Sequence, residues 1–310
     1  MVLKRALHLI VPICLLFLIF SSVSSDEVLS RIGAISPGWL VAAFLAAQAQ
    51  IVLSALRWQL TARCIGVPLP IGRALAEYYL SGVINMTVPG GVLGDGLRAI
   101  RSREINGFET AAHAVLIERL AGQLALAVVL CAGLLLSGIS TLQQAGVIGL
   151  VLFAVGMIVG PRLARVLPLR YVPDAVGRFR VSIRQSWFGP RIGMTQILLS
   201  LLIVAANLAS FTFAAAATGS TVGLVEVLFT VPLILFAMLI PFSIGGWGYR
   251  EGAAAAIFPL IGATAAAGVS ASVIFGAVIL VANLPGLLVL VKRKKAIGRS
   301  TEDVNTSDVA

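Results

Sequence analysis

The sequence predicts an all-α protein, a polytopic membrane bundle of six to eight spanning helices with an internal repeat. Two observations predict this class. Of the 310 residues, 59% are hydrophobic and 12% are charged, and the mean hydropathy is +1.01, whereas ordinary soluble domains are about 25% charged. The hydrophobic residues also form runs close to the roughly 20 residues that a helix needs to cross a bilayer. These observations exclude a soluble domain and leave no room for a sizeable domain outside the membrane.

Eight apolar runs are candidates for spanning helices. We expect them at residues 6–23, 39–56, 111–136, 145–159, 195–217, 224–240, 253–269 and 272–291, of which the fourth and seventh are short. The first run, with Lys4 and Arg5 before it and serines after it, also resembles a secretory signal peptide. Because the run is long for a signal peptide, we expect an uncleaved anchor. Residues 1–295 then form one transmembrane domain, and residues 296–310 a short, disordered cytoplasmic tail.

Basic residues predict the orientation, because lysine and arginine gather at the cytoplasmic ends of membrane helices. With the amino terminus inside, cytoplasmic loops receive every basic residue except Arg31, Arg119 and Arg250. Both termini of a multi-pass cell-membrane protein are then cytoplasmic. The net charge of +10 does not indicate a nucleic-acid partner, because nucleic-acid binding needs a basic face on a soluble fold.

A further apolar segment, residues 74–97, is interrupted by proline and several glycines and cannot be one continuous helix. Arg73 and Arg98 at its ends both belong on the cytoplasmic side, which predicts a re-entrant hairpin. Irregular backbone at membrane depth occurs only where protein or a water-filled cavity satisfies its polar groups. The hairpin is therefore the first candidate binding site, with candidate lipid-binding residues Asn85, Pro89, Gly90, Gly91, Gly94, Asp95 and Arg98.

The chemistry of this hairpin suits an anion. Glycines let the backbone approach a ligand closely, and successive amides at a new helix start form a nest that holds phosphate. Asp95 and Arg98 lie three residues apart and share a helix face, so they either pair or bind oppositely charged groups of a ligand. The alternative is a glycine-rich turn packed for close helix contact, with Asp95 as the helix cap.

Two more candidates, Glu118 and Arg119, lie near the start of the apolar run 111–136. Ionisable residues inside a span are costly and usually face an interior or a water-filled cavity. Neighbours in sequence diverge by about 100° around a helix, so we expect these two side chains to contact different partners. The alternative is a position at the membrane interface from which both side chains reach water.

A second broken segment spans residues 241–252. It repeats the order of a proline, a Gly-Gly pair, a further glycine and an arginine–acid pair at the start of an apolar helix. Two such segments in corresponding halves predict a repeated transporter architecture with a site at the repeat interface. Its candidate lipid-binding residues are Ser243, Gly245, Gly246, Arg250 and Glu251.

The topology of this second segment has two alternatives. Inverted symmetry brings it in from the outside, yet the basic cluster from Lys292 to Lys295 belongs in the cytoplasm. Full spans at residues 224–240, 253–269 and 272–291 satisfy the charge rule and place Arg250 inside. Both alternatives stay open.

Other chemistries find little support. The three cysteines, Cys14, Cys64 and Cys131, and the two histidines form neither a disulfide framework nor a metal site. The chain has no Gly-x-x-x-x-Gly-Lys loop for a nucleotide. We therefore expect no metal, no cofactor and no catalytic residue. Asn207 and Asn283 lie within apolar runs, where such residues usually hold helices together.

The motifs together resemble the lysylphosphatidylglycerol synthase transmembrane family, also called the flippase-like domain family. The resemblance covers roughly residues 5–295 and rests on Arg57-Trp58, Gly66-Val-Pro68, Asn85, Pro89-Gly90-Gly91, Gly94-Asp95, Arg98, Glu118-Arg119 and the segment from Pro241 to Glu251. In two-part members it implies a membrane half that moves aminoacylated phospholipid and a cytosolic half that synthesises it. The residues after Val291 are too few for an acyltransferase domain, so we do not expect synthase activity.

We therefore expect a non-enzymatic membrane protein that binds and translocates a polar or charged lipid, such as an aminoacylated phospholipid or a polyprenyl-linked lipid. Arginines and glycine amides would hold the phosphate, while the carboxylates would tune the arginines or bind a cationic headgroup. One alternative is a non-transporting subunit that presents lipid to a separately encoded glycosyltransferase or aminoacyl transferase. Another is a membrane-embedded enzyme acting on a lipid headgroup.

Overall fold

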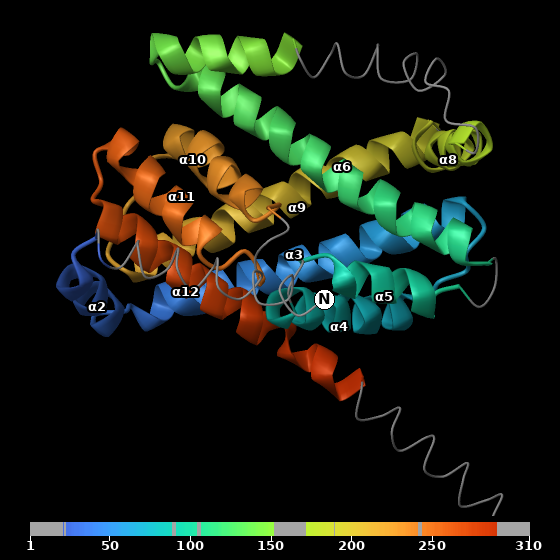
Figure 1. Cartoon of the computed structure of the whole chain (residues 1–310), viewed down its shortest axis with the longest axis horizontal. Coiled ribbons are helices and arrows are strands. Elements are labelled where there is room, and N and C mark those ends of the chain that lie inside the picture. The colour runs from blue at the N-terminus through green and yellow to red at the C-terminus, as the bar shows by residue number, and fades with distance from the viewer. Residues whose placement is uncertain are drawn as a thin grey trace, which may run out of the picture.

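The computed structural model describes residues 21–289 except 22, 89–90, 104–106, 152–171, 189 and 241–243. Regular structure in these ranges is entirely helical (Figure 1), which confirms the predicted all-α class. The elements are α2 (Ser25–Gly33), α3 (Pro37–Cys64), α4 (Ile71–Thr87), α5 (Leu93–Arg101), α6 (Gly107–Leu136), α8 (Val172–Trp187), α9 (Pro190–Ala217), α10 (Leu224–Ala237), α11 (Tyr249–Ile257), η1 (Phe258–Ile261), α12 (Ala265–Asn283) and η2 (Leu284–Gly286). Residues 140–151 are also helical.

Four helical stretches are long and apolar enough to cross a membrane: Pro37–Cys64, Gly107–Leu136, Ile192–Ala217 and Ala265–Val289. They contain the predicted runs 39–56, 111–136 and 195–217, and the run 272–291 as far as residue 289. Most of the predicted run 224–240 forms the shorter apolar helix α10, which ends at Ala237. Almost all of the run 6–23, the part of the run 145–159 beyond residue 151 and the predicted tail 296–310 lie outside the described residues.

The predicted span 253–269 is wrong. Helix α11 ends at Ile257, and the 3-10 turn η1 follows. Gly262 then adopts a left-handed conformation with φ of 77°, and α12 begins only after Thr264. Pro259 cannot donate the backbone bond that would continue the helix, and a glycine at positive φ ends it. The apolar run therefore contains a helix boundary that hydropathy alone does not reveal.

Hydrogen bonds define two ends of the bundle, which we call the α2 end and the α8 end. At the α2 end, the Ser36 amide donates to the Ala217 carbonyl at 3.0 Å, and the Thr264 hydroxyl donates to Glu27 at 2.7 Å. At the α8 end, Gln196 donates to Thr61 at 2.9 Å. Figure 1 shows α2 at the left and α8 at the right of the molecule.

The first broken segment folds into a hairpin, α4–α5, whose outer ends lie together at the α8 end. Arg73 near the start of α4 donates to the carbonyl of Arg101 at the end of α5, at 2.6 Å. Arg101 also pairs with Glu77 at 2.7 Å. The chain therefore enters and leaves the hairpin at one end of the bundle, as the positions of the basic residues predict.

The second broken segment forms the hairpin α10–α11, whose ends lie at the α2 end. Arg31 donates to Ser220, just before α10, at 3.2 Å, and the Thr264 bond to Glu27 fixes the chain just after η1. The single helix α12 then runs away from this end, and Gly286 beyond it lies against Tyr79 of α4. The second hairpin thus enters and leaves at the α2 end, and the last helix runs from there toward the opposite end. Inverted symmetry of the second hairpin is therefore compatible with a last helix that ends on the side of the first hairpin's ends.

The element order agrees with the predicted internal repeat. A long helix, a short helix, a glycine-rich break, a nine-residue helix and another long helix occur as α3–α4–α5–α6 and again as α9–α10–α11–α12. Helix α3 packs along its counterpart α9. The contact of α6 with α10 in one set also has its counterpart in the contact of α12 with α4. The first set starts at the α2 end and the second at the α8 end, so the two sets are inverted relative to each other.

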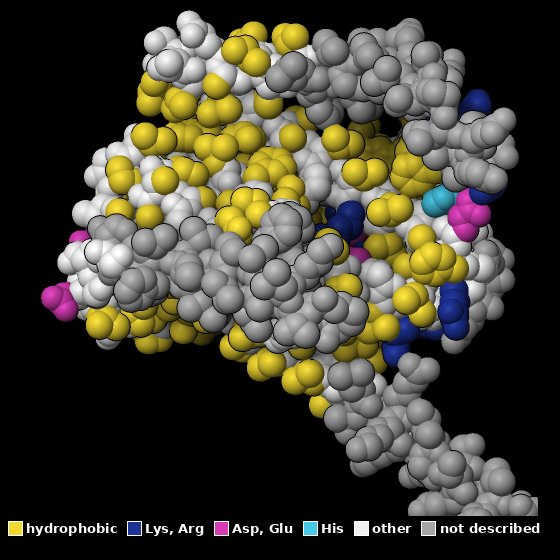
Figure 2. Space-filling view, in the orientation of Figure 1, with side chains coloured by type: hydrophobic (Ala, Val, Ile, Leu, Met, Phe, Trp, Pro, Cys, Tyr) yellow, Lys and Arg dark blue, Asp and Glu magenta, His cyan; other side chains and the backbone are white. Residues whose placement is uncertain are grey.

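Two large apolar cores, and a small one around Val28 of α2, hold the described part of the bundle. One, at the α8 end, packs α3 against the first hairpin and α6 around Trp58, Ala74 and Ala99. The other packs the second hairpin against α3, α9 and α12 around Phe211, Phe258 and Phe275. Hydrophobic side chains also cover much of the outer surface, and charged side chains are visible in a recess near the middle of the face shown in Figure 2. Such a surface is expected of a protein surrounded by lipid.

Candidate functional site

The first hairpin is closed at its tip by Asn85, which precedes the break. Its Oδ1 accepts a bond from the Gly94 amide at 2.8 Å, and its Nδ2 donates to Asp95 at 3.0 Å. A Cβ at Gly94 would lie 2.2 Å from the Ser81 carbonyl oxygen, so glycine is needed for α5 to approach α4. Asp95 is not the cap of α5, which begins after Val92.

The amides at the start of α5 are largely occupied by the protein itself. Asn85 takes the Gly94 amide, and the Val92 carbonyl takes the amides of Asp95 and Gly96. The backbone amides of Gly94, Asp95 and Gly96 therefore do not form the open anion nest that the sequence suggests. The positive charge at this site comes from side chains instead.

Those side chains form a buried ion cluster of three arginines and two carboxylates. One carboxylate oxygen of Glu118 accepts a hydrogen bond from Arg57 at 2.7 Å, and the other accepts one from Arg98 at 3.1 Å. Asp95 accepts a hydrogen bond from Arg98 at 3.0 Å and also forms an ion pair with Arg119. Arg57, Arg98 and Glu118 are at most 3% exposed, whereas the Arg119 side chain is 33% exposed. Three cations against two anions leave one unit of positive charge, and Arg119 is the cation with access to a ligand.

Two helix-geometry predictions are confirmed here. Asp95 and Arg98 share a face and pair directly, and Glu118 and Arg119 contact different partners. The alternative in which Glu118 and Arg119 both reach water is wrong for Glu118, which is 2% exposed. Arg98 is held further by two aromatic rings, because its guanidinium lies 4.5 Å from the centre of the Trp58 ring and 4.6 Å from that of Tyr78.

Sequence reasoning missed Arg57 as a site residue and counted it among the loop arginines. It lies inside α3, is 3% exposed and also donates to Ser200 of α9 at 3.0 Å. Arg98 was likewise counted as a loop charge and is buried. The available signal for Arg57 was its position directly after the apolar run 39–56, within the same helix.

A cavity of about 310 Å³ adjoins this cluster. Three charged residues line it, Arg57, Glu118 and Arg119, together with Tyr78. Five amide side chains complete its polar wall: Gln50, Asn85, Gln123, Asn207 and Asn283. Asn207 and Asn283, which the sequence suggests only hold helices together, are thus part of the cavity wall.

The second glycine motif reaches the same cavity. Gly245 and Gly246 adopt positive φ angles of 57° and 81°, and both line the cavity with Gly91 of the first break. A Cβ at Gly245 would lie 2.9 Å from the Met86 Cα, so the second break touches the end of α4, next to the first break. The sequence predicts a site at the repeat interface, and the structure brings the two motifs together there.

Arg250 and Glu251 are placed differently. Both are fully buried, and they pair with each other at 2.6 Å. Glu251 also accepts the Gly248 amide at 2.7 Å and the Ser272 hydroxyl at 3.0 Å, and Arg250 lies over the Trp247 ring at 4.9 Å. Neither residue lines the cavity. This pair fixes α11 to α12.

The predicted site residues therefore divide into three groups. Six line the cavity directly: Asn85, Gly91, Glu118, Arg119, Gly245 and Gly246. Gly94, Asp95 and Arg98 lie behind it, and Arg250 and Glu251 lie apart. Pro89, Gly90 and Ser243 lie outside the described residues.

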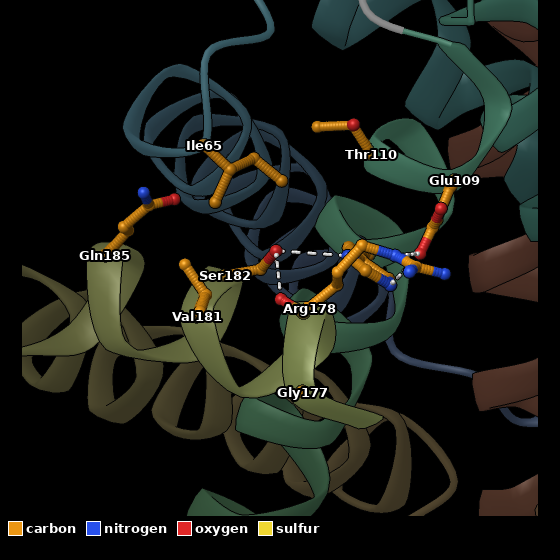
Figure 3. A pocket seen from close by; sticks show the side chains of 9 residues that line it. Ile65, Glu109, Thr110, Gly177, Arg178, Val181, Ser182 and Gln185 are labelled. Carbon is orange, nitrogen blue, oxygen red and sulfur yellow. Dashed lines mark hydrogen bonds and ion pairs between the residues drawn. The ribbon is translucent and has the colours of Figure 1, made fainter. Parts of the chain in front are cut away.

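A second cavity, of about 580 Å³, lies at the α8 end. Figure 3 shows Arg178, Val181 and Gln185 of α8 on one side and Glu109 and Thr110 of α6 on the other. Glu109 and Arg178 pair at 2.6 Å, and both side chains are at least half exposed. This cavity is larger, but its charges are balanced and open to solvent, so the smaller cavity is the better candidate for holding a charged ligand away from water.

An apolar groove of about 260 Å³ lies between α6 and α9. Leu124, Val128 and Leu201 are among its lining residues, with Ser200 at its inner side. Ser200 accepts the bond from Arg57, which lines the polar cavity. The Arg57–Ser200 bond therefore lies between the groove and the polar cavity.

Comparison with known proteins places the chain in a family. No curated protein matches it in a direct sequence comparison. The family model described as "Lysylphosphatidylglycerol synthase TM region" matches residues 5–286, which include the ion cluster, both glycine motifs and the helices from α2 to η2. The chain therefore belongs to the lysylphosphatidylglycerol synthase transmembrane family and is a membrane protein.

Proposed function

We propose that the protein binds a polar or charged lipid in the cavity between the two hairpins and moves its headgroup between the leaflets of the cell membrane. One observation carries this proposal: a buried ion cluster with one excess positive charge lines a cavity where the two glycine breaks meet. An excess buried charge is costly unless a counter-charge compensates it. A lipid phosphate supplies that counter-charge.

The arrangement of the hairpins supports translocation rather than simple binding. We place the α8 end in the cytoplasm, because Arg63, Arg73, Arg101 and Arg103 lie near it, and the hairpins then enter the membrane from opposite sides. Inverted repeats with broken helices at the midplane are typical of transporters whose central site opens to either side. Both termini are cytoplasmic in this topology.

The main barrier to unassisted flipping is desolvation of the headgroup. The cavity lowers this cost because arginine and amide side chains replace water around the headgroup. The groove between α6 and α9 gives the acyl chains an apolar surface beside the Arg57–Ser200 bond. No step of this process requires a catalytic residue, so we propose that the chain acts as a lipid translocator and not as an enzyme.

A leaflet-exchange assay tests this proposal. The full chain is purified and placed in liposomes that carry fluorescent phospholipid in one leaflet. Wild type is expected to accelerate exchange, and Arg119→Ala to reduce the rate by at least about tenfold, because the loss of a charge-assisted bond costs about 1.5–3 kcal/mol. The variant should still fold, since Asp95 keeps its bonds from Arg98, Asn85 and Ser81.

Arg178→Ala is the matched control, because it removes an exposed arginine at the α8 end and should not change the rate. If wild type fails to accelerate exchange of anionic, zwitterionic and aminoacylated phospholipids, translocation is contradicted. The family membership would then favour a subunit that presents lipid to a separately encoded transferase.

A further inference from the structure

We infer that the protein has a second lipid site at the α8 end, where the groove between α6 and α9 holds an acyl chain and the exposed arginines of α8 hold the phosphate of an anionic phospholipid. This site is separate from the cavity between the hairpins. It rests on the proposed function only for the placement of the α8 end in the cytoplasm, and it does not require translocation. Three features of α8 carry it: its position, its two flanks and its exposed arginines.

Helix α8 packs on the ends of three long helices. The Ser182 hydroxyl of α8 forms a hydrogen bond of 3.0 Å with the His113 ring near the start of α6. The Ser186 carbonyl accepts a bond from Gln196 near the start of α9 at 3.4 Å. Ile65, which directly follows α3, lines the cavity beside α8. With 16 residues that include three arginines, α8 does not itself span a membrane, and its place at the helix ends puts it near the membrane surface.

The two flanks of α8 border different surroundings. One flank, with Arg178 and Gln185, lines the polar cavity in Figure 3, opposite Glu109 of α6. The other flank carries Trp187, which lines the apolar groove between α6 and α9. Tryptophan is enriched where the membrane meets water, so α8 lies at the boundary between a polar and an apolar region.

The groove runs from Trp187 toward the middle of the bundle. Its lining residues follow α6 from residue 121 to 128 and α9 from residue 197 to 201, and both helices start at the α8 end. Of the eight described residues that line it, only Ser200 is polar. The groove therefore suits an acyl chain whose glycerol end lies at Trp187, and it does not suit a soluble polar partner.

Arg180 and Arg184 supply the charge for the phosphate. Both are exposed, whereas Ser182 and Ser186 on the opposite face of α8 are buried. Neither arginine has a partner in the part of the chain that the structure describes. They lie four residues apart and are neighbours on one helix face, and Arg184 is also one turn before Trp187. A phosphate at the end of the groove is thus within reach of α8.

The chemistry of the site favours a phospholipid with a net negative charge. Arginine binds phosphate through charge-assisted hydrogen bonds, and each basic residue at a membrane surface adds about 1 kcal/mol to the attraction of anionic lipid. In phosphatidylcholine the choline group compensates the phosphate, whereas in phosphatidylglycerol the phosphate keeps its charge. We therefore expect phosphatidylglycerol to bind at this site more tightly than phosphatidylcholine.

Brominated lipids test the site, because bromine on an acyl chain quenches the fluorescence of a tryptophan that it contacts. The full chain is placed in phosphatidylcholine vesicles that contain a small fraction of brominated phosphatidylglycerol or of brominated phosphatidylcholine with the same chains. The difference between wild type and Trp187→Phe isolates the signal of Trp187. The apparent affinity of the brominated phosphatidylglycerol is expected to be at least about fivefold higher, the equivalent of about 1 kcal/mol from one arginine.

Two double variants separate a site on α8 from the general charge of this end. Arg180→Gln with Arg184→Gln should remove the preference for phosphatidylglycerol. Arg63→Gln with Arg103→Gln is the matched control, because it removes two exposed arginines from the same end of the bundle but outside α8, and it should keep the preference. All four side chains are exposed, so both double variants should keep the wild-type Tm.

Equal quenching of Trp187 by the two lipids in wild type would overturn the inference and leave the exposed arginines to a soluble acidic partner. A preference that the control variant loses as fully as the α8 variant would also overturn it, because the charge of the whole end would then attract the lipid. These results differ from failure of the proposed function. Absence of leaflet exchange with the lipid preference intact removes translocation alone, whereas leaflet exchange without the preference removes only this second site.

Discussion

At the scale of single residues, arginines in this membrane protein follow two different designs. In the cluster around Glu118, each carboxylate is shared between two arginines, and one positive charge remains next to a cavity. In the second hairpin, Arg250 and Glu251 form a closed and neutral pair. The cluster around Glu118 can bind an anionic ligand, whereas the Arg250–Glu251 pair holds α11 against α12.

We predict that Arg250→Ala destabilises the protein by about 3–5 kcal/mol, because it leaves Glu251 as an unpaired charge in a buried position. The sequence motif suggests instead that Arg250 binds lipid. The measurement is the Tm of both proteins in the same detergent. The double variant Arg250→Met with Glu251→Gln should recover much of the loss, because it removes both charges.

If Arg250→Ala kept the wild-type Tm and lost lipid exchange, Arg250 would contact lipid and the structural role would be refuted.

Residue spacing predicted some of these contacts and missed others for a physical reason. The pairing of Asp95 with Arg98 follows from local helix geometry, as does the divergence of Glu118 and Arg119. The bond from Arg57 to Glu118 joins residues on two different helices, and no local rule predicts it. Arg57 was assigned to a loop because a count of charges near membrane ends does not distinguish a buried arginine from one in water.

At the scale of the elements, the contact between the two breaks depends on glycine. We predict that Gly245→Ala destabilises the protein by about 1–3 kcal/mol, because its φ of 57° is unfavourable for alanine. The added Cβ would also lie 2.9 Å from the Met86 backbone. Gly72→Ala is the matched control, since no atom lies within 4 Å of its added Cβ, and alanine in a helix gains up to about 1 kcal/mol. Equal Tm values for both variants would contradict a tight contact between the breaks.

The α2 end provides a test by pH. The Thr264 hydroxyl and then Arg31 lower the pKa of the Glu27 carboxyl below its ordinary value of 4.5. A lowered folded pKa stabilises the fold above the unfolded pKa, and this contribution is lost as the pH falls through the folded value. Glu27→Gln should therefore lower the free energy of unfolding near neutral pH by less than about 1 kcal/mol for this partly exposed pair, seen as a slightly lower Tm. It should have no effect well below pH 4.5. A Tm difference that persists in acid would contradict this account of Glu27.

Hydropathy predicted the long helices but not the second hairpin. The runs in α3, α6 and α9 each form one helix, because a long apolar run must satisfy its backbone internally. The run 253–269 is equally apolar, yet it contains the end of α11, the turn η1 and the start of α12. The signals of that boundary were Pro259 and Gly262, and a mean hydropathy over a window of many residues does not show such single residues.

At the scale of the whole molecule, the inverted order of the two helix sets explains why motifs about 150 residues apart line one cavity. Helices α3 and α9 pack together in opposite directions, so each hairpin extends inward from its own end and the two tips meet at Met86 and Gly245. The sequence predicted the repeat from two short motifs. The cavity itself follows only from the packing of all the elements.

The central claim is that lipid headgroups pass through this cavity, and filling it tests that claim most directly. Asn207→Trp places a large ring in the cavity wall on α9, whereas Leu198→Trp places the same ring on an exposed position of the same helix. Leaflet exchange is measured for both in the same liposomes. We predict background exchange for Asn207→Trp and the wild-type rate for Leu198→Trp, with similar Tm values. Wild-type exchange by folded Asn207→Trp would contradict the claim.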